Sequence, residues 1–471
     1  MPSAYAPPNR IDDRILNRSL ARTRRAVFWL DDGAPAPEPS LRGRHHADLV
    51  VVGGGYTGLW TALLAKQREP SARVVLLEAQ QIAWAASGRN GGFCEASLTH
   101  GDENGRLHFA QDLPLLNRLG AENLDAIERT VTGWSFDTEF ERTGMLQVAT
   151  EEHQLDGLRK LASAENETYL DAEAVQQQVK SPLYRGGVHL SDTVAMVHPA
   201  KLAWGLRAAC LEAGVLIAEN TAATDLTRDG TDIIVSTPNG SVKTRKVALA
   251  TSAFPSLLKR ADLFVVPVYD YVLMTEPLTS SHIADIGWHQ RYGIADSSRQ
   301  FHYYRLTADN RILFGGYDAV YHRGGAIRSE HDDRPVTFRK LADHFFRTFP
   351  QLTDVDFTHA WGGAIDMSTK LVAHTGSAFR GQVAYTAGYT GLGVGATRFG
   401  ATVMLDVLSG DKTELTELAM VKTKPFPIPP EPIAYPAIQL TRAAVARSDE
   451  RNGRDGPLLK LMGALHIGFD T

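Results

Sequence analysis

The sequence predicts an α/β chain, α+β overall, and two kinds of pattern carry that prediction. Residues 48–78 read as a buried strand, a glycine-rich turn, a helix and a second buried strand. Residues 264–275 and 299–317 instead alternate β-branched, aromatic and polar residues, as antiparallel strands do. The first pattern predicts a Rossmann-like dinucleotide-binding domain. The others predict a second domain built on an antiparallel sheet.

Each residue type in the first unit has a physical reason. Gly53, Gly55 and Gly58 have the spacing G-x-G-x-x-G, which suits a tight turn, close approach of a pyrophosphate and close helix–strand packing. The helix that follows offers unpaired N–H groups and a positive dipole end to phosphates. Glu78 ends the second strand, where it can bind ribose hydroxyls and would repel a 2′-phosphate. A G-x-G-x-x-G motif alone is weak evidence for nucleotide binding. Here a strand, the motif, a helix, a second strand and a terminal Glu follow one another, which disfavours an ordinary βα turn.

Composition narrows the class of protein. The 471 residues suggest two or three structural units, and 43% are hydrophobic. The net charge is −5 without a basic face or tail, so we expect no nucleic acid partner. No apolar run is long enough to span a membrane, and the N-terminus lacks a signal-peptide core. Cys94 and Cys210 are the only cysteines, which predicts no metal cluster and a reducing, cytoplasmic location.

Two further stretches are rich in glycine. Residues 82–94 combine Ser, Arg and Asn with glycines, so side chains can hydrogen-bond polar atoms while the backbone comes close. A plain surface loop is an equal alternative for this fragment alone. Residues 383–387 read as a strand, and residues 388–395 as a turn opening a helix to about residue 408. That helix start is a second site suited to an anion.

The segments VVVGGGYTGLWTALLAK and AASGRNGGF together resemble the D-amino-acid oxidase (DAO) superfamily of FAD-dependent oxidoreductases. The chain looks most like the branch of γ-glutamylputrescine oxidase, next to sarcosine and glycine oxidases. The resemblance extends from about residue 45 to 410 and includes the hairpin YYRLT…ILFGG and the turn GYTGLG. One departure is MSTKLVAHTG after Asp366, where the family usually carries a proline.

The resemblance implies FAD as cofactor, bound without a covalent link. Ser87 and Arg89 would reach the pyrophosphate or ribityl chain, and the turn before the last helix would face the flavin pyrimidine ring. A bond from Cys94 to the flavin is the minor alternative to a buried thiol. The cofactor-binding residues implied are Gly53, Gly55, Tyr56, Thr57, Gly58, Glu78, Ala79, Ser87, Gly88, Arg89, Asn90, Gly91, Gly92, Thr251, Gly388, Tyr389, Thr390, Gly391, Leu392 and Gly393.

The candidates for the substrate side are Tyr271, His302, Tyr304 and Trp361. Aromatic rings could flank an amine or bind it by cation–π contact, and His302 could act as a base. Packing within the sheet is the alternative for each of the four. Because side chains alternate along a strand, only one face of the strand around His302 can point inward.

The resemblance implies oxidation of a primary or secondary amine, an amino acid or polyamine derivative, to an imine. Hydride would pass to flavin N5, and oxygen would reoxidise the flavin to give hydrogen peroxide. A dehydrogenase that hands electrons to a quinone or carrier protein is the main alternative. A tRNA-directed flavoprotein is less favoured, because no basic stripe is present. An NAD-only enzyme would leave two glycine-rich stretches without a ligand.

These patterns also divide the chain. The terminal segments are expected to lie on the surface or across a homodimer. We expect an N-terminal arm (1–44), a discontinuous FAD-binding domain (45–100, 190–260 and 355–410), a substrate-binding domain (101–189 and 261–354) and a C-terminal extension (411–471).

Overall fold

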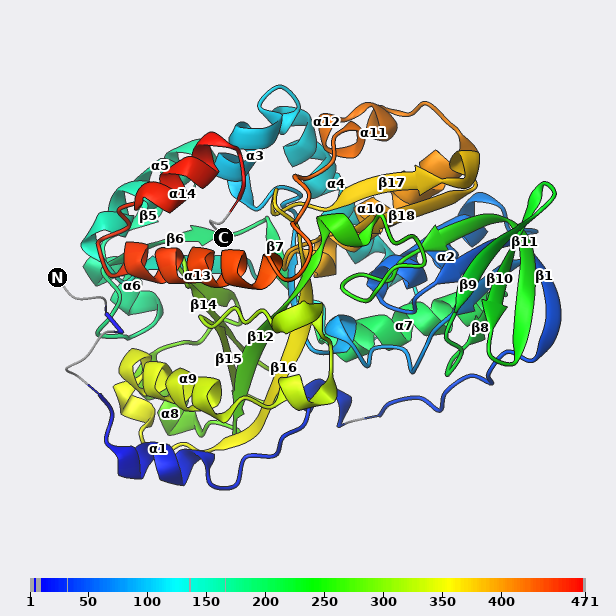
Figure 1. Ribbon diagram of the computed structural model, residues 1–471. Helices are drawn as coiled ribbons and strands as arrows, with labels where there is room; N and C mark the ends of the chain where they lie inside the picture. Colours follow the sequence, from blue (N-terminus) through cyan, green and yellow to red (C-terminus); the bar gives the residue numbers. More distant parts are fainter. Residues whose placement is uncertain (1–3, 6–9, 32, 135–136, 166, 469–471) are drawn as a thin grey trace.

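Two eight-stranded sheets, each with its own helices, lie side by side in the computed structural model (Figure 1). The structure describes residues 4–5, 10–31, 33–134, 137–165 and 167–468. Within these ranges, no helix is both long and apolar enough to cross a membrane. The predicted α/β fold with an additional sheet is confirmed, and that second sheet is antiparallel apart from one parallel strand pair.

The first sheet is parallel at its centre, in the order β18-β11-β1-β2-β8. Val50 and Val51 on β1 are fully buried, one on each face, as the continuous apolar run predicts. Antiparallel strands extend it: β17 lies beside β18, and β10 and β9 continue from β11. The strands are β1 (Gly43–Val52), β2 (Val74–Leu77), β8 (Leu216–Ala218), β9 (Asp225–Asp229), β10 (Asp232–Thr237), β11 (Gly240–Leu249), β17 (His374–Ala378) and β18 (Val383–Ala387).

Three helices cover one face of this sheet. α2 (Tyr56–Arg68) packs between α7 (Pro199–Glu212) and α10 (Gly393–Ser409). Nearly all of α2 is buried, including Leu59 and Trp60 at 0% exposure. A helix so enclosed holds its N-terminus in a defined place at the carboxyl end of β1, where open α/β sheets bind ligands.

The second sheet has the order β16-β12-β15-β14-β13-β4-β6-β5, and its two faces differ. One face packs on α9 (Pro335–Thr348), with α1 (Asp13–Leu20) behind it. Alternate residues such as Val272 and Leu313 join the core of the first unit. The strands are β4 (Met145–Ala149), β5 (Tyr169–Leu170), β6 (Gly186–Leu190), β12 (Val266–Thr275), β13 (Gly293–Asp296), β14 (His302–Leu306), β15 (Ile312–Gly316) and β16 (Phe357–Met367).

The smaller elements connect these layers. A short ribbon of β3 (Phe93–Glu95) and β7 (Val194–Met196) lies between the sheets. The remaining helices are α3 (Gly101–Phe109), α4 (Leu113–Gly133), α5 (Leu155–Glu165), α6 (Ala172–Gln178), α8 (Ser280–Ile286), α11 (Glu414–Glu417), α12 (Ala419–Lys422), α13 (Ala434–Asp449) and α14 (Pro457–Ala464), with 3-10 turns η1 (Phe28–Leu30), η2 (Ala86–Gly88) and η6 (Ser329–Asp332).

The domain ranges expected from sequence stay a prediction, with one boundary worth noting. β16, which those ranges place in the FAD-binding domain, pairs with β12 in the second sheet. The C-terminal extension lies against the second unit: Asp449 on α13 accepts from the Arg299 and Gln300 amides at 3.1 and 2.9 Å. The homodimer also stays a prediction.

Candidate active site

The turn between β1 and α2 is shaped by its glycines. Gly53 has φ +105°, and a Cβ there would press on the carbonyl of Ala250, the residue before Thr251. A Cβ on Gly58 would overlap the carbonyl oxygen of Gly53, so only glycine lets the helix start so close to the strand. The backbone at Gly55 is the N-cap of α2, which leaves helix N–H groups facing outward at this turn.

Glu78 lies beside this turn and accepts three hydrogen bonds. Its Oε1 accepts from the Gln80 amide at 2.8 Å and the Trp84 indole at 3.0 Å, and its Oε2 accepts from the Gly54 amide at 2.6 Å. Burial raises the pKa of this carboxyl above its usual value. A carboxylate has about four acceptor positions, so one remains for a hydroxyl such as that of a ribose.

Two tryptophans hold consecutive carbonyls of the loop at residues 87–92. The Trp361 indole N–H donates to the Arg89 carbonyl, and the Trp29 indole N–H donates to the Asn90 carbonyl, both at 2.9 Å. In a trans peptide the next N–H points the opposite way. Within the described residues, the amides of Asn90 and Gly91 have no hydrogen-bond partner. This loop therefore presents two adjacent, fixed N–H donors to a ligand.

The other side chains of this loop act mainly on the loop itself. Ser87 Oγ accepts from the Tyr56 amide at 3.0 Å, which joins the loop to the start of α2. The Asn90 amide group donates to the Ala86 carbonyl and accepts from the Gly92 amide, both at 2.9 Å. Asn90 therefore shapes the turn through its side chain and serves a ligand through its backbone.

Arg89 lies differently from the expected pyrophosphate contact. Its guanidinium forms an ion pair with Asp332 on η6 and donates to the Gly362 carbonyl at 3.0 Å and the Trp84 carbonyl at 2.7 Å. These contacts tie the loop to β16 and η6. The structure does not bring the guanidinium together with the β1–α2 turn.

The third glycine-rich stretch forms the start of α10. Asp366 Oδ2 accepts from the Gly388 amide at 2.7 Å, and the Asp366 carbonyl accepts from the Thr390 amide at 2.9 Å. Burial raises the pKa of the Asp366 carboxyl to about 6. The Thr57 hydroxyl donates to the Tyr389 hydroxyl at 3.0 Å, so the starts of α2 and α10 meet. Two positive helix ends thus converge on one place.

The remaining predicted cofactor residues lie on these same segments. Leu392 is buried in the apolar cluster beside α10, and its neighbour Gly393 begins the helix. Gly391 has φ +94°, which favours glycine in this turn. Ala79 directly follows Glu78. Gly88 packs on the Ala83 carbonyl, and Gly92 packs on the Val197 carbonyl.

The four predicted substrate residues separate between the two faces of the second sheet. His302 faces α9, bonded to Asp296 at 2.7 Å and His344 at 2.9 Å, and Tyr304 shares that face through its 2.6 Å bond to Tyr184. The Tyr271 hydroxyl likewise donates to the His331 carbonyl at 2.9 Å, on the side of Phe338 in α9. Of the four, the structure brings only Trp361 to the loop at residues 87–92.

Sequence reasoning missed the residues on the opposite face of β14 and β12. A Cβ on Gly91 would lie 2.7 Å from the Tyr303 ring, so this ring faces the loop. The Tyr303 hydroxyl donates to Asp270 on β12. The alternation Phe301-His302-Tyr303-Tyr304 was the available signal, but it could not tell which face was inward.

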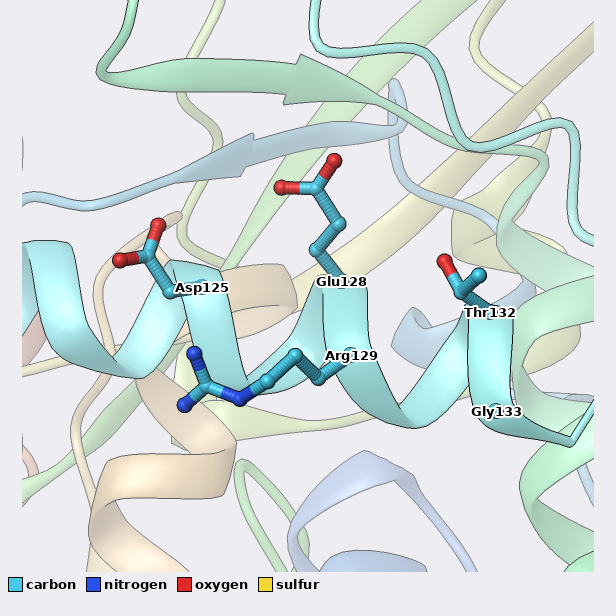
Figure 2. A pocket seen from close by; sticks show the side chains of 5 residues that line it. All are labelled: Asp125, Glu128, Arg129, Thr132 and Gly133. Carbon is cyan, nitrogen blue, oxygen red and sulfur yellow. The ribbon is translucent and has the colours of Figure 1, made fainter.

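Two further features lie outside this arrangement. Cys94 is fully buried in the apolar core, on the strand side opposite Phe93 and Glu95, and burial raises the pKa of its thiol to about 12. A surface hollow is lined by one helix, α4, through Asp125, Glu128, Arg129, Thr132 and Gly133 (Figure 2). Arg142 binds two of its acids at 2.7 and 2.9 Å.

Among the described residues, no group of three or more His, Cys, Asp or Glu side chains could hold a metal ion.

Comparison with known proteins decides the family. The DAO family model, described as FAD dependent oxidoreductase, matches residues 48–406, which is most of the chain. The chain belongs to the DAO family of FAD-dependent oxidoreductases. The γ-glutamylputrescine oxidoreductase of Escherichia coli (strain K12) is 30% identical over 405 residues, covering 83% of this chain and 90% of that protein.

Other relatives agree with the DAO assignment. A probable oxidoreductase, OrdL, of Haemophilus influenzae is 27% identical over 391 residues, covering 80% of this chain and 86% of that protein. The crystal structure of glycine oxidase from Geobacillus kaustophilus superposes with a TM-score of 0.66 at 18% identity, covering 80% of this chain and 99% of that one. At 18% identity, the similarity to the glycine oxidase structure shows the fold alone.

The residues present fit FAD, the cofactor of the DAO family. The converging starts of α2 and α10 suit its phosphates and the electron-rich edge of its ring, and Glu78 retains an acceptor position for a ribose hydroxyl. The unpartnered amides of Asn90 and Gly91 suit a polar edge of the flavin. The chain is therefore an FAD-dependent oxidoreductase, and its sequence-derived family and cofactor are confirmed.

Proposed function

We propose that this enzyme oxidises a primary or secondary amine to an imine, with oxygen as the electron acceptor and hydrogen peroxide as the product. The supporting observation is the arrangement opposite the two unpartnered amides of Asn90 and Gly91. There the second sheet presents Tyr303, whose ring lies against Gly91 and can confine a small organic substrate against the flavin. The 30% identity to a γ-glutamylputrescine oxidoreductase supports an amine rather than an alcohol.

Bound FAD supplies the acceptor for a hydride from the carbon next to the substrate nitrogen. The protein's own contribution is to position the substrate and the flavin and to exclude water. The two tryptophan indoles fix the amides at residues 90 and 91, so no reorganisation is needed when charge develops nearby. The N-terminus of α10 adds a positive potential that favours negative charge on a bound group.

The test begins with the visible spectrum of the purified protein, followed by anaerobic titration with amines. The panel holds putrescine, γ-glutamylputrescine, sarcosine, glycine, longer amino acids and aminophosphonates. Bleaching of the oxidised-flavin spectrum by one class of amine supports the proposal. A flavin spectrum that none of these amines bleaches would refute the proposal for this panel.

The electron acceptor needs its own measurement. An oxygen electrode and a peroxide assay should show one peroxide for each amine consumed. Fast reduction of a quinone-like dye without oxygen uptake would instead indicate a dehydrogenase that uses another acceptor. Trp288→Phe is a suitable control in both assays, because Trp288 is buried in the core on the α9 side of the second sheet, beside Tyr304 and Phe349.

A further inference from the structure

The face of the second sheet that meets the loop at residues 87–92 carries an acid. Asp270 on β12 and Tyr303 on β14 are separated by β15, where Gly315 stands opposite Tyr303. A Cβ on Gly315 would lie 2.9 Å from the Tyr303 ring, so the ring lies directly over this glycine. The Tyr303 hydroxyl can therefore reach across the strand and donate to Asp270 Oδ2.

Asp270 is held firmly but has no cationic partner. Its Oδ1 accepts from the Tyr271 amide at 2.8 Å, and no ion pair to it exists within the described ranges. Two arginines on neighbouring segments are engaged elsewhere. Arg305 donates to the Val197 carbonyl at 2.6 Å, and Arg89 pairs with Asp332. Asp270 is only half-buried, so part of the residue stays accessible to a ligand.

A second acid, Glu95, lies on the side of β3 that faces Tyr303. Phe93 on β3 packs edge-on against Tyr303, with ring centroids 5.7 Å apart. Glu95 is two residues further along β3 and so points to the same side. In the described part of the chain its carboxyl makes no hydrogen bond and no ion pair. Burial raises the pKa of Glu95 to about 7 and that of Asp270 to about 6.

Asp270 and Glu95 are both without an ion pair among the described residues, and two such acids favour a positive ligand. A carboxylate gains most from a charged N–H donor when both are removed from water. A substrate with a carboxylate next to its nitrogen would instead place two negative charges close together, which is unfavourable in a buried site.

We propose that Asp270, positioned by Tyr303, binds the substrate nitrogen as it arrives in its cationic form and selects amines that carry no carboxylate on the oxidised carbon. The nitrogen then gives up one proton to water before the hydride leaves the neighbouring carbon. This inference rests on the proposed function, because it deepens the substrate class of the same site. It favours alkyl amines and diamines over α-amino acids. Asp270 acts here as a specificity-determining residue, and Tyr303 as its positioning residue.

The test separates binding from turnover by using ligands that have no hydrogen on the carbon to be oxidised. tert-Butylammonium, tert-butanol and pivalate share one shape but are positive, neutral and negative. Their dissociation constants for the FAD-loaded protein are measured by calorimetry and by the shift of the flavin spectrum. The wild type should bind tert-butylammonium most tightly and pivalate least.

Three variants test the inference. Asp270→Asn keeps an acceptor for the Tyr271 amide. It should weaken the binding of tert-butylammonium about 10- to 100-fold and leave the binding of tert-butanol unchanged. Tyr303→Phe should weaken it by about threefold to tenfold, since the carboxylate stays but loses its fixed orientation. Asp285→Asn, an exposed acid on α8, removes the same charge and should match the wild type.

The outcomes distinguish the two proposals. If Asp270→Asn retains its FAD and binds tert-butylammonium as the wild type does, the inference is overturned even where the wild type oxidises amines. If cation binding depends on Asp270 but no amine reduces the flavin, the inference stands and amine oxidation fails. Preference of the wild type for pivalate over tert-butylammonium would also overturn the inference.

Discussion

Replacing Trp29 with phenylalanine tests whether the N-terminal arm positions the flavin loop. Trp29 is 1% exposed, and its indole donates a 2.9 Å hydrogen bond to the Asn90 carbonyl. The variant removes this donor and leaves a buried carbonyl unpaired, which costs about 1–3 kcal/mol. The freed peptide no longer fixes the direction of the Gly91 N–H. If the whole cost appears in cofactor binding, the Kd for FAD rises roughly 5- to 150-fold.

A matched control separates the hydrogen bond from the loss of volume. Trp288 is fully buried in the other core, and its indole N–H has no hydrogen-bond partner. Trp288→Phe therefore removes the same atoms without breaking a hydrogen bond. Both variants should melt at a lower temperature than the wild type, because each leaves a small cavity. Only Trp29→Phe should bind FAD more weakly.

The assay is titration of the apoprotein with FAD, followed by flavin fluorescence, with thermal melting measured beside it. Trp361→Phe provides a second instance, since its indole holds the Arg89 carbonyl at the same distance of 2.9 Å. Equal FAD affinity in Trp29→Phe and Trp288→Phe would refute the role assigned to the indole N–H. Loss of affinity in both would show that core packing alone governs binding.

The remaining predictions each rest on a single residue. Gly58→Ala should lose FAD and melt at a lower temperature, because its Cβ overlaps the Gly53 carbonyl; Gly157→Ala, with open space around it, should be stabilised by about 0.5–1 kcal/mol. His302→Asn should lower the melting temperature but leave the rate of flavin reduction by an amine unchanged in stopped flow, since His302 faces α9. The affinity for tert-butylammonium should fall as the pH drops through about 6, where burial places the pKa of Asp270. An affinity that does not change between pH 5 and 7 would contradict this assignment. Burial raises this pKa above the value in the unfolded chain, so the contribution of Asp270 to folding stability falls as the pH rises toward 6. At pH 7 the apoprotein of Asp270→Asn, which has no carboxyl to ionise, should therefore melt at a higher temperature than the wild-type apoprotein.

The cofactor unit could be recognised from sequence because its signals are local. A buried strand, the G-x-G-x-x-G turn, a helix and a terminal Glu78 are contiguous, and each follows from backbone geometry and burial along one short segment. The same holds for the turn before α10, where glycines at 388 and 391 adopt positive φ. The structure has these elements at these positions, and the family comparison confirms FAD as the cofactor, whereas the residues that bind it stay a prediction.

The substrate side depended on contacts between residues far apart in the chain. Alternation along β14 predicts two faces, but only the packing of α9 on one of them directs His302 away from the loop and Tyr303 toward it. The sequence likewise could not show that Arg89 pairs with Asp332 or that Trp29 reaches Asn90. Local backbone preferences are set within a few residues, whereas the inward face of a strand is decided by whichever distant element buries it.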